Sequence, residues 1–178
     1  MSALWTLPDF DDHESVHVFR DSKAGLTALI AIHSTHLGPA GGGTRFWHYP
    51  EPDAAITDAL RLSRGMSYKN AMAGLAMGGG KAVILADANR TKTPALIAAF
   101  ARSVDSLAGK YVTAQDVGIS QQDIIDIARG TRFVSGLPPK SGGAGGDPGP
   151  STALGVFLGV KAAVQRALGK DDMAGVHV

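Results

Sequence analysis

A run of three glycines places the strongest constraint on the fold of this 178-residue chain. Gly78, Gly79 and Gly80 immediately precede Lys81, and glycine runs occur where a backbone must turn tightly or let another group come close. Lys69 stands 12 residues before Lys81, and the chain between the two lysines is mostly apolar and holds no carboxylate. Desolvation in such surroundings disfavours an ammonium group unless an anion arrives from elsewhere, and a bound carboxylate would fit. The alternative is that both lysines reach solvent from the ends of their elements.

Composition limits the classes of protein to which the chain can belong. With 44% hydrophobic and 19% charged residues, the chain can bury a sizeable core. Its 17 basic and 16 acidic residues leave a net charge of +1, which gives no electrostatic case for a nucleic acid or an anionic membrane as partner. The lack of cysteine excludes disulfides and thiolate catalysis. No leader or membrane-spanning run is evident, so we expect a cytoplasmic protein with a small-molecule partner.

Apolar periodicity and turn signals predict strands that alternate with helices. The expected strands cover 16–20, 26–33, 44–49, 82–86 and 111–113. The expected helices run from Pro52 toward Lys69, over 94–108, from Ser120 to Gly130, and over 152–168. Residues 38–43 are expected to form a glycine-rich loop, and 135–150 a long loop or hinge. This alternation predicts an α/β layer fold.

Several common binding motifs are incomplete in this chain. Residues 75–82 end in Gly-Lys, but Leu75 stands where a phosphate-binding loop needs glycine, and Ala82 where it needs serine or threonine. No segment satisfies Gly-x-Gly-x-x-Gly, so a complete dinucleotide fingerprint is absent. The six histidines form no helical ligand pair, and we expect no metal site.

Asp116 follows an expected strand, which is a usual position for a catalytic group in α/β folds. An aspartate at a strand-to-helix turn is also a common structural residue that caps the next helix. Taken alone, Asp116 therefore leaves both interpretations open. Together with the two lysines it completes a recognisable set.

Four segments of the chain form a set: LGPAGGGTR (37–45), GMSYKNA (65–71), GGGKA (78–82) and TAQDVG (113–118). Together they resemble the glutamate/leucine/phenylalanine/valine dehydrogenases, and most closely the leucine and phenylalanine branch. The resemblance continues in order over roughly 14–178. It implies a three-layer, mixed-sheet amino-terminal domain over 1–150 that binds substrate and forms a homo-oligomer. It also implies that 151–178 hold a linking helix and the start of a truncated dinucleotide-binding domain, with the first Rossmann strand at 176–178.

The resemblance assigns catalytic and substrate-binding roles to five positions. Lys69 would hold the α-carboxylate of the substrate, while the backbone of Gly42 and Gly43 would let that carboxylate approach closely. Lys81, with a lowered pKa, would activate the water that attacks an imine, and Asp116 would move the proton on the amine. Desolvation and a nearby second ammonium both lower a lysine pKa, which agrees with this role.

Further roles concern the substrate side chain and the cofactor. By resemblance, Gly41 and Ala114 line the substrate site, and Asp147, Pro148 and Thr152 contact the cofactor, which would be NAD. Gly41 stands where leucine-type enzymes usually carry a bulkier aliphatic residue. We therefore expect a larger pocket that favours leucine or an aromatic side chain.

The resemblance implies a reversible, NAD-dependent oxidative deamination of an apolar L-amino acid to its 2-oxo acid and ammonia. The alternative is a catalytically incomplete module that binds substrate or forms oligomers, or a regulatory relative without dinucleotide binding. A Gly-x-Gly-x-x-Gly segment followed by an acidic residue, beyond Val178, would distinguish these possibilities.

Overall fold

The computed structural model describes residues 3–139 and 145–177. The strands are β1 (Ser15–Asp21), β2 (Leu26–Ser34), β3 (Ala40–Trp47), β4 (Gly78–Leu85) and β5 (Tyr111–Gln115). The α-helices are α1 (Pro52–Met72), α2 (Pro94–Ser106), α3 (Gln121–Ala128) and α4 (Gly149–Leu168), and a short 3₁₀ helix covers Leu4–Thr6. Strands and helices alternate from β3 to α3, as the apolar pattern predicted.

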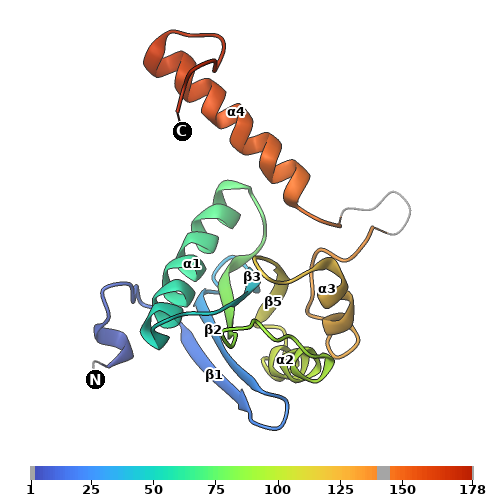
Figure 1. The fold of residues 1–178 in the computed structure, drawn as a ribbon. Coiled ribbons are helices and arrows are strands. Elements are labelled where there is room, and N and C mark those ends of the chain that lie inside the picture. Colours follow the sequence, from blue (N-terminus) through green and yellow to red (C-terminus); the bar gives the residue numbers. More distant parts are fainter. Residues whose placement is uncertain (1–2, 140–144, 178) are drawn as a thin grey trace.

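The five strands form one mixed sheet in the order β1-β2-β4-β3-β5. β1 and β2 form the expected antiparallel hairpin, and β2 is antiparallel to β4. β3 runs parallel to both β4 and β5. Helix α1 covers one face of the sheet, and α2 and α3 cover the other (Figure 1). The expected three-layer mixed-sheet fold is confirmed.

Two apolar clusters hold these layers together. The larger cluster lies between the sheet and helices α2 and α3, and its largest buried side chains include those of Phe100, Tyr111, Ile30, Ile84 and Ile124. The smaller cluster lies under α1, and its buried members are Leu29, Ala31, Ala55, Ala59 and Val83. Because three of these five residues are alanines, α1 can approach the sheet closely.

The helices on the second face begin as their sequences predict. Thr93 caps α2 by accepting a hydrogen bond from the Leu96 amide, and Pro94 occupies the first turn. Ser120 and Asp123 form a reciprocal capping box at the start of α3. Local capping chemistry is therefore sufficient to set both helix starts.

Both glycine segments lie within strands, which corrects the expectation of a glycine-rich loop at 38–43 and of a strand that begins only after Lys81. β3 already begins at Ala40, and β4 begins at Gly78. The reason is packing on the α1 side, because a Cβ placed on Gly79 would lie 2.2 Å from both the amide nitrogen and the hydroxyl of Ser67. Glycine is a poor strand former by itself, but here it lets the helix backbone approach the sheet.

The opposite side of the same strands receives a buried tyrosine. A Cβ on Gly80 would lie 2.7 Å from the Tyr111 ring, and the Tyr111 hydroxyl donates a hydrogen bond of 2.7 Å to the Gly42 carbonyl. Burial raises the pKa of Tyr111 to about 12, so its hydroxyl stays protonated and can donate. Tyr111 therefore packs against the glycine backbone, and hydrogen-bonds to it, on the face of the sheet opposite α1.

Helix α4 confirms the helix expected at 152–168 and begins three residues earlier. It stands away from the sheet in Figure 1, and its apolar residues Leu154, Val156, Phe157 and Leu158 are exposed. Val176 and His177 form no strand, and Val178 lies outside the described residues, as does 140–144 within the expected loop at 135–150. A lone strand needs a neighbour to receive its hydrogen bonds. No helix in the described part of the chain is both long and apolar enough to cross a membrane.

The contact between α1 and β4 predicts opposite effects for two glycine-to-alanine changes. We expect Gly79→Ala to lower the free energy of unfolding by about 1–3 kcal/mol, because its methyl group meets backbone atoms that cannot move aside. Gly65 is exposed within α1, and a methyl group there meets nothing within 4 Å. Gly65→Ala should therefore raise the free energy of unfolding by about 0.5–1 kcal/mol. Urea denaturation of both variants tests this, and equal effects would contradict the close approach of helix and strand.

Candidate active site

A cleft of about 300 Å³ lies beside the glycine segments of β3 and β4. It brings together most residues expected to act in catalysis and substrate binding: Gly41, Gly42, Gly43, Lys69, Lys81, Ala114 and Asp116. The end of α1 and the strand β5 supply its other walls. Residues that are far apart in the sequence thus share one small cleft, in which the charged groups stand among mostly apolar walls.

An ion pair between Lys81 and Asp116 is the central interaction of this cleft. The Lys81 Nζ donates to Asp116 Oδ2 over 2.5 Å. Lys81 lies on β4 and Asp116 directly follows β5, so β3 runs between them. A Cβ placed on Gly43 of β3 would lie 2.8 Å from the Asp116 Cβ. The absence of a side chain at Gly43 therefore lets the pair form across the intervening strand.

Lys81 is only 5% exposed, and its proton affinity reflects this position. Burial lowers the pKa of Lys81, Asp116 opposes that effect, and the positive charge of Arg45 adds to it. The counter-ion thus comes from a residue 35 positions along the chain. The anion expected to arrive from elsewhere is therefore, for Lys81, the Asp116 carboxylate of the same chain, which the acid-free local segment could not identify.

Asp116 is ionised within this cluster. Burial by itself would raise its pKa, but the hydrogen bond and charge of Lys81, with the charge of Arg45, bring the pKa of Asp116 below its ordinary value. The alternative role as a helix cap does not match the structure, since Ser120 and Asp123 cap α3. The side chain of Asp116 instead faces the lysine.

Lys69 lies in the last turn of α1, is exposed, and lines the same cleft. None of the ion pairs within the described residues includes Lys69. Its neighbour Asn70 is buried and donates hydrogen bonds to the carbonyls of Gly78, at 2.6 Å, and Gly41, at 3.4 Å. Asn70 therefore fastens the end of α1 to both glycine strands and sets where Lys69 stands. Sequence reasoning missed Asn70, although it directly follows Lys69 in a quoted motif.

A second missed group is the Arg45 side chain on β3. Its Nη1 donates to Asp58 Oδ2 at 2.7 Å, and its Nε lies 3.4 Å from Asp116 Oδ2. The Tyr49 hydroxyl also donates to Asp58 Oδ2, at 2.7 Å. Arg45 therefore joins the carboxylate of the central pair to an acid on α1. The only signal in the sequence was its place at the end of a glycine motif.

The space beside Gly41 is already occupied, which corrects the expectation of an enlarged pocket. A Cβ on Gly41 would lie 2.5 Å from the Met77 Cε and 3.3 Å from its sulfur. Both residues line the cleft. The flexible Met77 side chain fills the room that the glycine leaves.

The residues expected to contact a cofactor lie next to Asp116. A neighbouring hollow of about 460 Å³ is lined by Asp116 together with Asp147, Pro148 and Thr152. Pro148 also lines the cleft that holds Lys81, so the two spaces adjoin. Among the described residues, no group of three or more His, Cys, Asp or Glu side chains is placed to hold a metal ion.

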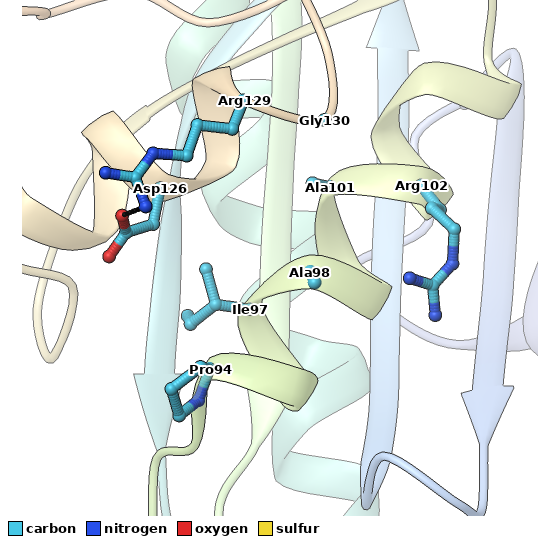
Figure 2. Close-up of a pocket in the computed structure, with 8 residues that line it drawn as sticks. All are labelled: Pro94, Ile97, Ala98, Ala101, Arg102, Asp126, Arg129 and Gly130. Atoms are coloured by element: carbon cyan, nitrogen blue, oxygen red, sulfur yellow. Dashed lines mark ion pairs between the residues drawn. The ribbon is translucent and has the colours of Figure 1, made fainter.

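Figure 2 shows another cavity, of about 470 Å³, between α2 and α3. Its walls are mostly small or apolar, and its charged groups are already paired: Arg129 with Asp126 at 2.9 Å, and Arg102 with Asp21 at 3.2 Å. It shares no residue with the cleft that holds Lys81. The titratable cluster described above is therefore the stronger candidate for catalysis.

The arrangement agrees with the relatives found by sequence comparison. The family described as "Glu/Leu/Phe/Val dehydrogenase, dimerisation domain" matches residues 13–132. A leucine dehydrogenase of Geobacillus stearothermophilus is 49% identical over 164 residues, which cover 92% of this chain and 44% of that protein. A valine dehydrogenase of Streptomyces virginiae is 51% identical over 170 residues, which cover 96% of this chain and 47% of that protein.

Solved structures give the same result. The L-tryptophan dehydrogenase of Nostoc punctiforme is 45% identical, with a TM-score of 0.69 over 92% of this chain and 45% of that one. The chain thus spans slightly less than half the length of these relatives. With a family match over residues 13–132, the chain belongs to the Glu/Leu/Phe/Val dehydrogenase family.

Proposed function

We propose that this chain is the amino-terminal, substrate-binding and oligomer-forming part of an NAD-dependent dehydrogenase that deaminates an apolar L-amino acid. The observation that carries the proposal is the ion pair between the buried Lys81 and the half-buried Asp116, set in one cleft with Lys69. A lysine whose pKa is lowered gives up its proton more readily than an exposed lysine, a neighbouring carboxylate can accept a proton, and a second lysine supplies a positive charge. Leucine, valine and tryptophan dehydrogenases among the relatives support an amino acid as substrate.

We place the domain boundary near residue 150. Residues 1–150 would form the substrate-binding and dimerisation domain, and 151–178 the linking helix and the start of a dinucleotide-binding domain. The exposed apolar residues of α4 support a helix that packs against further protein. The family description as a dimerisation domain supports a homo-oligomer, and the cysteine-free composition agrees with a cytoplasmic location.

In the proposed mechanism, Lys69 binds the α-carboxylate of the substrate, and the bare backbone of Gly42 and Gly43 lets the carboxylate end approach. Asp116 then accepts a proton from the substrate ammonium. The resulting neutral amine can lose hydride from its Cα, because the nitrogen lone pair stabilises the iminium that forms. Arg45 keeps a positive charge near Asp116 throughout this step.

Lys81 would act in the second half of the reaction. As a neutral amine it takes a proton from the water that attacks the iminium carbon, and its lowered pKa makes that form accessible. Asp116 then gives its proton to the amine of the resulting carbinolamine, and as ammonia leaves, the Asp116 carboxylate takes up the hydroxyl proton, so that the 2-oxo acid forms. Lys81, again an ammonium, polarises the new oxo group.

NAD, when bound, supplies the acceptor for the hydride. Asp147, Pro148 and Thr152 line the hollow that adjoins the substrate cleft, and they would hold the nicotinamide end beside Asp116. The 178 residues contain no Gly-x-Gly-x-x-Gly segment for the pyrophosphate. We therefore propose that pyrophosphate binding depends on residues beyond this chain.

The second candidate function is a module that binds substrate or forms oligomers without turnover of its own. The observation that favours it is length, since the chain spans slightly less than half of its relatives. The two functions differ in one measurable property. Both predict amino-acid binding by the chain, but only the enzyme predicts turnover once a dinucleotide-binding domain is joined to it.

The direct test joins residues 1–178 to the remaining carboxyl-terminal part of the Geobacillus relative and measures NAD reduction with L-leucine. We expect turnover, and we expect Lys81→Ala to reduce kcat by at least 10²-fold, because it removes the base. Lys69→Ala should chiefly raise KM, because it removes binding common to the ground and transition states. A kcat within tenfold of the parent for Lys81→Ala would contradict the assignment.

Binding by the chain alone provides the control. NMR titration with L-leucine and with its 2-oxo acid should show saturable shifts in cleft residues such as Ala114, and Lys69→Ala should weaken both. Lys161→Ala, a surface change on α4, removes a lysine outside the cleft and should leave binding unchanged. A folded fusion without turnover, together with intact binding by the chain, would favour the module.

Asp116→Asn should separate a role in catalysis from a role in stability. At neutral pH the change leaves the buried Lys81 ammonium without its counter-ion, so we expect the free energy of unfolding to fall by about 1–3 kcal/mol. The pKa of Lys81 in the folded chain lies below its ordinary value, so between those two pKa values the unfolded state binds more protons. The stability of the variant should therefore recover as pH rises toward 10.

Lys81→Met combined with Asp116→Asn is the matched control, because it removes the titrating amine. Thermal unfolding measured between pH 6 and about pH 10 should show no such recovery in the double variant. In the fusion, Asp116→Asn should lower the rate by about 10²-fold at any pH where it is folded. If the rate of the Asp116→Asn fusion falls only in proportion to its folded fraction, the role of Asp116 is purely structural.

Met77 and Gly41 should control the preferred substrate size together. Gly41→Leu forces the Met77 side chain into the cleft and should favour valine over phenylalanine, whereas Met77→Ala opens the cleft and should do the reverse. Each change should alter the ratio of kcat/KM for the two substrates by about 10- to 200-fold. The double variant should return toward the parent ratio, and additive effects would show that the two side chains do not share one space.

A further inference from the structure

We infer that Arg45, held in place by Asp58, is a positioning residue that keeps Asp116 ionised when Lys81 gives up its proton. The inference concerns the Lys81 base of the proposed function and rests on it for its catalytic meaning. Its structural basis is a chain of four side chains, which come from β4, β3, α1 and the turn that follows β5. Asp116 Oδ2 meets both Lys81 Nζ, at 2.5 Å, and Arg45 Nε, at 3.4 Å, while Arg45 Nη1 meets Asp58 at 2.7 Å.

The ion pair with Asp116 by itself would hinder Lys81 from acting as a base. An opposite charge at hydrogen-bond distance stabilises an ammonium and raises its pKa, so a lysine paired only with Asp116 would hold its proton. Loss of that proton would also leave a half-buried carboxylate without a counter-ion, which is costly. A simple Lys81–Asp116 pair would therefore resist the step in which Lys81 acts as a base.

Arg45 affects both the proton affinity of Lys81 and the cost of leaving Asp116 without a counter-ion. Its guanidinium stays charged at all relevant pH values, so Asp116 retains a cationic partner when Lys81 becomes neutral. Lys81 Nζ and Arg45 Nε both approach Asp116 Oδ2, so the two cations lie close to each other. One charge shifts the pKa of another group over roughly 4–6 Å, and the two cations are within that range. Arg45 therefore favours the neutral form of Lys81, and the direction of the Lys81 pKa agrees.

Asp58 holds the arginine at this distance. Its Oδ2 accepts both Arg45 Nη1 and the Tyr49 hydroxyl, each at 2.7 Å, and it stands on α1, which packs against the strand of Lys81. Tyr49 stays neutral because burial raises its pKa above the ordinary value. The other charged group that faces the cleft is Lys69, on the same helix. Asp58 thus fixes Arg45 and also opposes part of its charge.

This geometry predicts shifts of opposite sign for two substitutions. Arg45→Met removes a cation near Lys81, so the pKa of Lys81 should rise by about one unit. Asp58→Asn removes an anion but leaves the arginine charged, so the pKa of Lys81 should fall. General damage to the cleft would admit water and move Lys81 in one direction in both variants, toward its ordinary value.

The experiment is an NMR pH titration of the 178-residue chain with ¹³C-labelled lysine, following the Lys81 Cε resonance. Lys81→Met identifies that resonance by its loss. Arg45→Lys should restore a pKa close to that of the parent, because it returns the charge. Arg102→Met is the matched control, since it removes an arginine from the Asp21 pair outside the cleft and should cause no shift.

The inference is supported if Arg45→Met and Asp58→Asn shift Lys81 in opposite directions and Arg45→Lys restores it. It is overturned if Arg45→Met leaves the Lys81 pKa unchanged, or if both variants move it the same way. If Arg45→Met does not fold, Arg45→Lys and Asp58→Asn still decide, since the inference requires little shift in the first and a fall in the second. The titration needs neither substrate nor cofactor, so its outcome is independent of whether the fused protein turns over L-leucine.

Discussion

The contact of α1 with the glycine strands is the constraint on which the rest of the structure depends. Gly79 brings the helix backbone at Ser67 against β4, and Asn70 then fastens the next turn of the helix to the carbonyls of β3 and β4. A methyl group at Gly79 would push the helix away and would take Lys69 and Asp58 with it. The missing side chains of the glycines are therefore what allow the cleft to exist.

The missing side chain of a glycine also allows the Lys81–Asp116 ion pair to form. Lys81 lies on β4 and Asp116 directly follows β5, two strands that are not neighbours, and a side chain at Gly43 would stand between the two residues. Their meeting produces an ammonium that is buried, paired and also repelled by a nearby guanidinium. Burial and like charge favour the neutral amine, whereas the ion pair favours the ammonium. The site thus combines opposing effects on the proton of Lys81, as is typical of groups that transfer protons in active sites.

Packing within the cleft also decides how much room the glycine at position 41 leaves for a ligand. The glycine at position 41 suggests a large pocket when it is considered alone, but Met77 occupies the room beside it. A flexible thioether side chain can take several positions at little cost, so such a wall adapts to its contents more easily than a branched residue would. The shape of the pocket is therefore a property of the pair and not of either residue.

The sequence by itself determined the order of strands and helices, the hairpin of β1 and β2 and the caps of α2 and α3, because these follow from local periodicity and local hydrogen bonds. Its motifs also indicated Lys69, Lys81 and Asp116, which the structure brings into one cleft. Only the tertiary structure decided that the glycine segments are strands, that Asp116 neutralises Lys81, and that Arg45 and Met77 belong to the site. Each of these depends on atoms from distant parts of the chain, and neither residue propensity nor spacing along one segment carries that information.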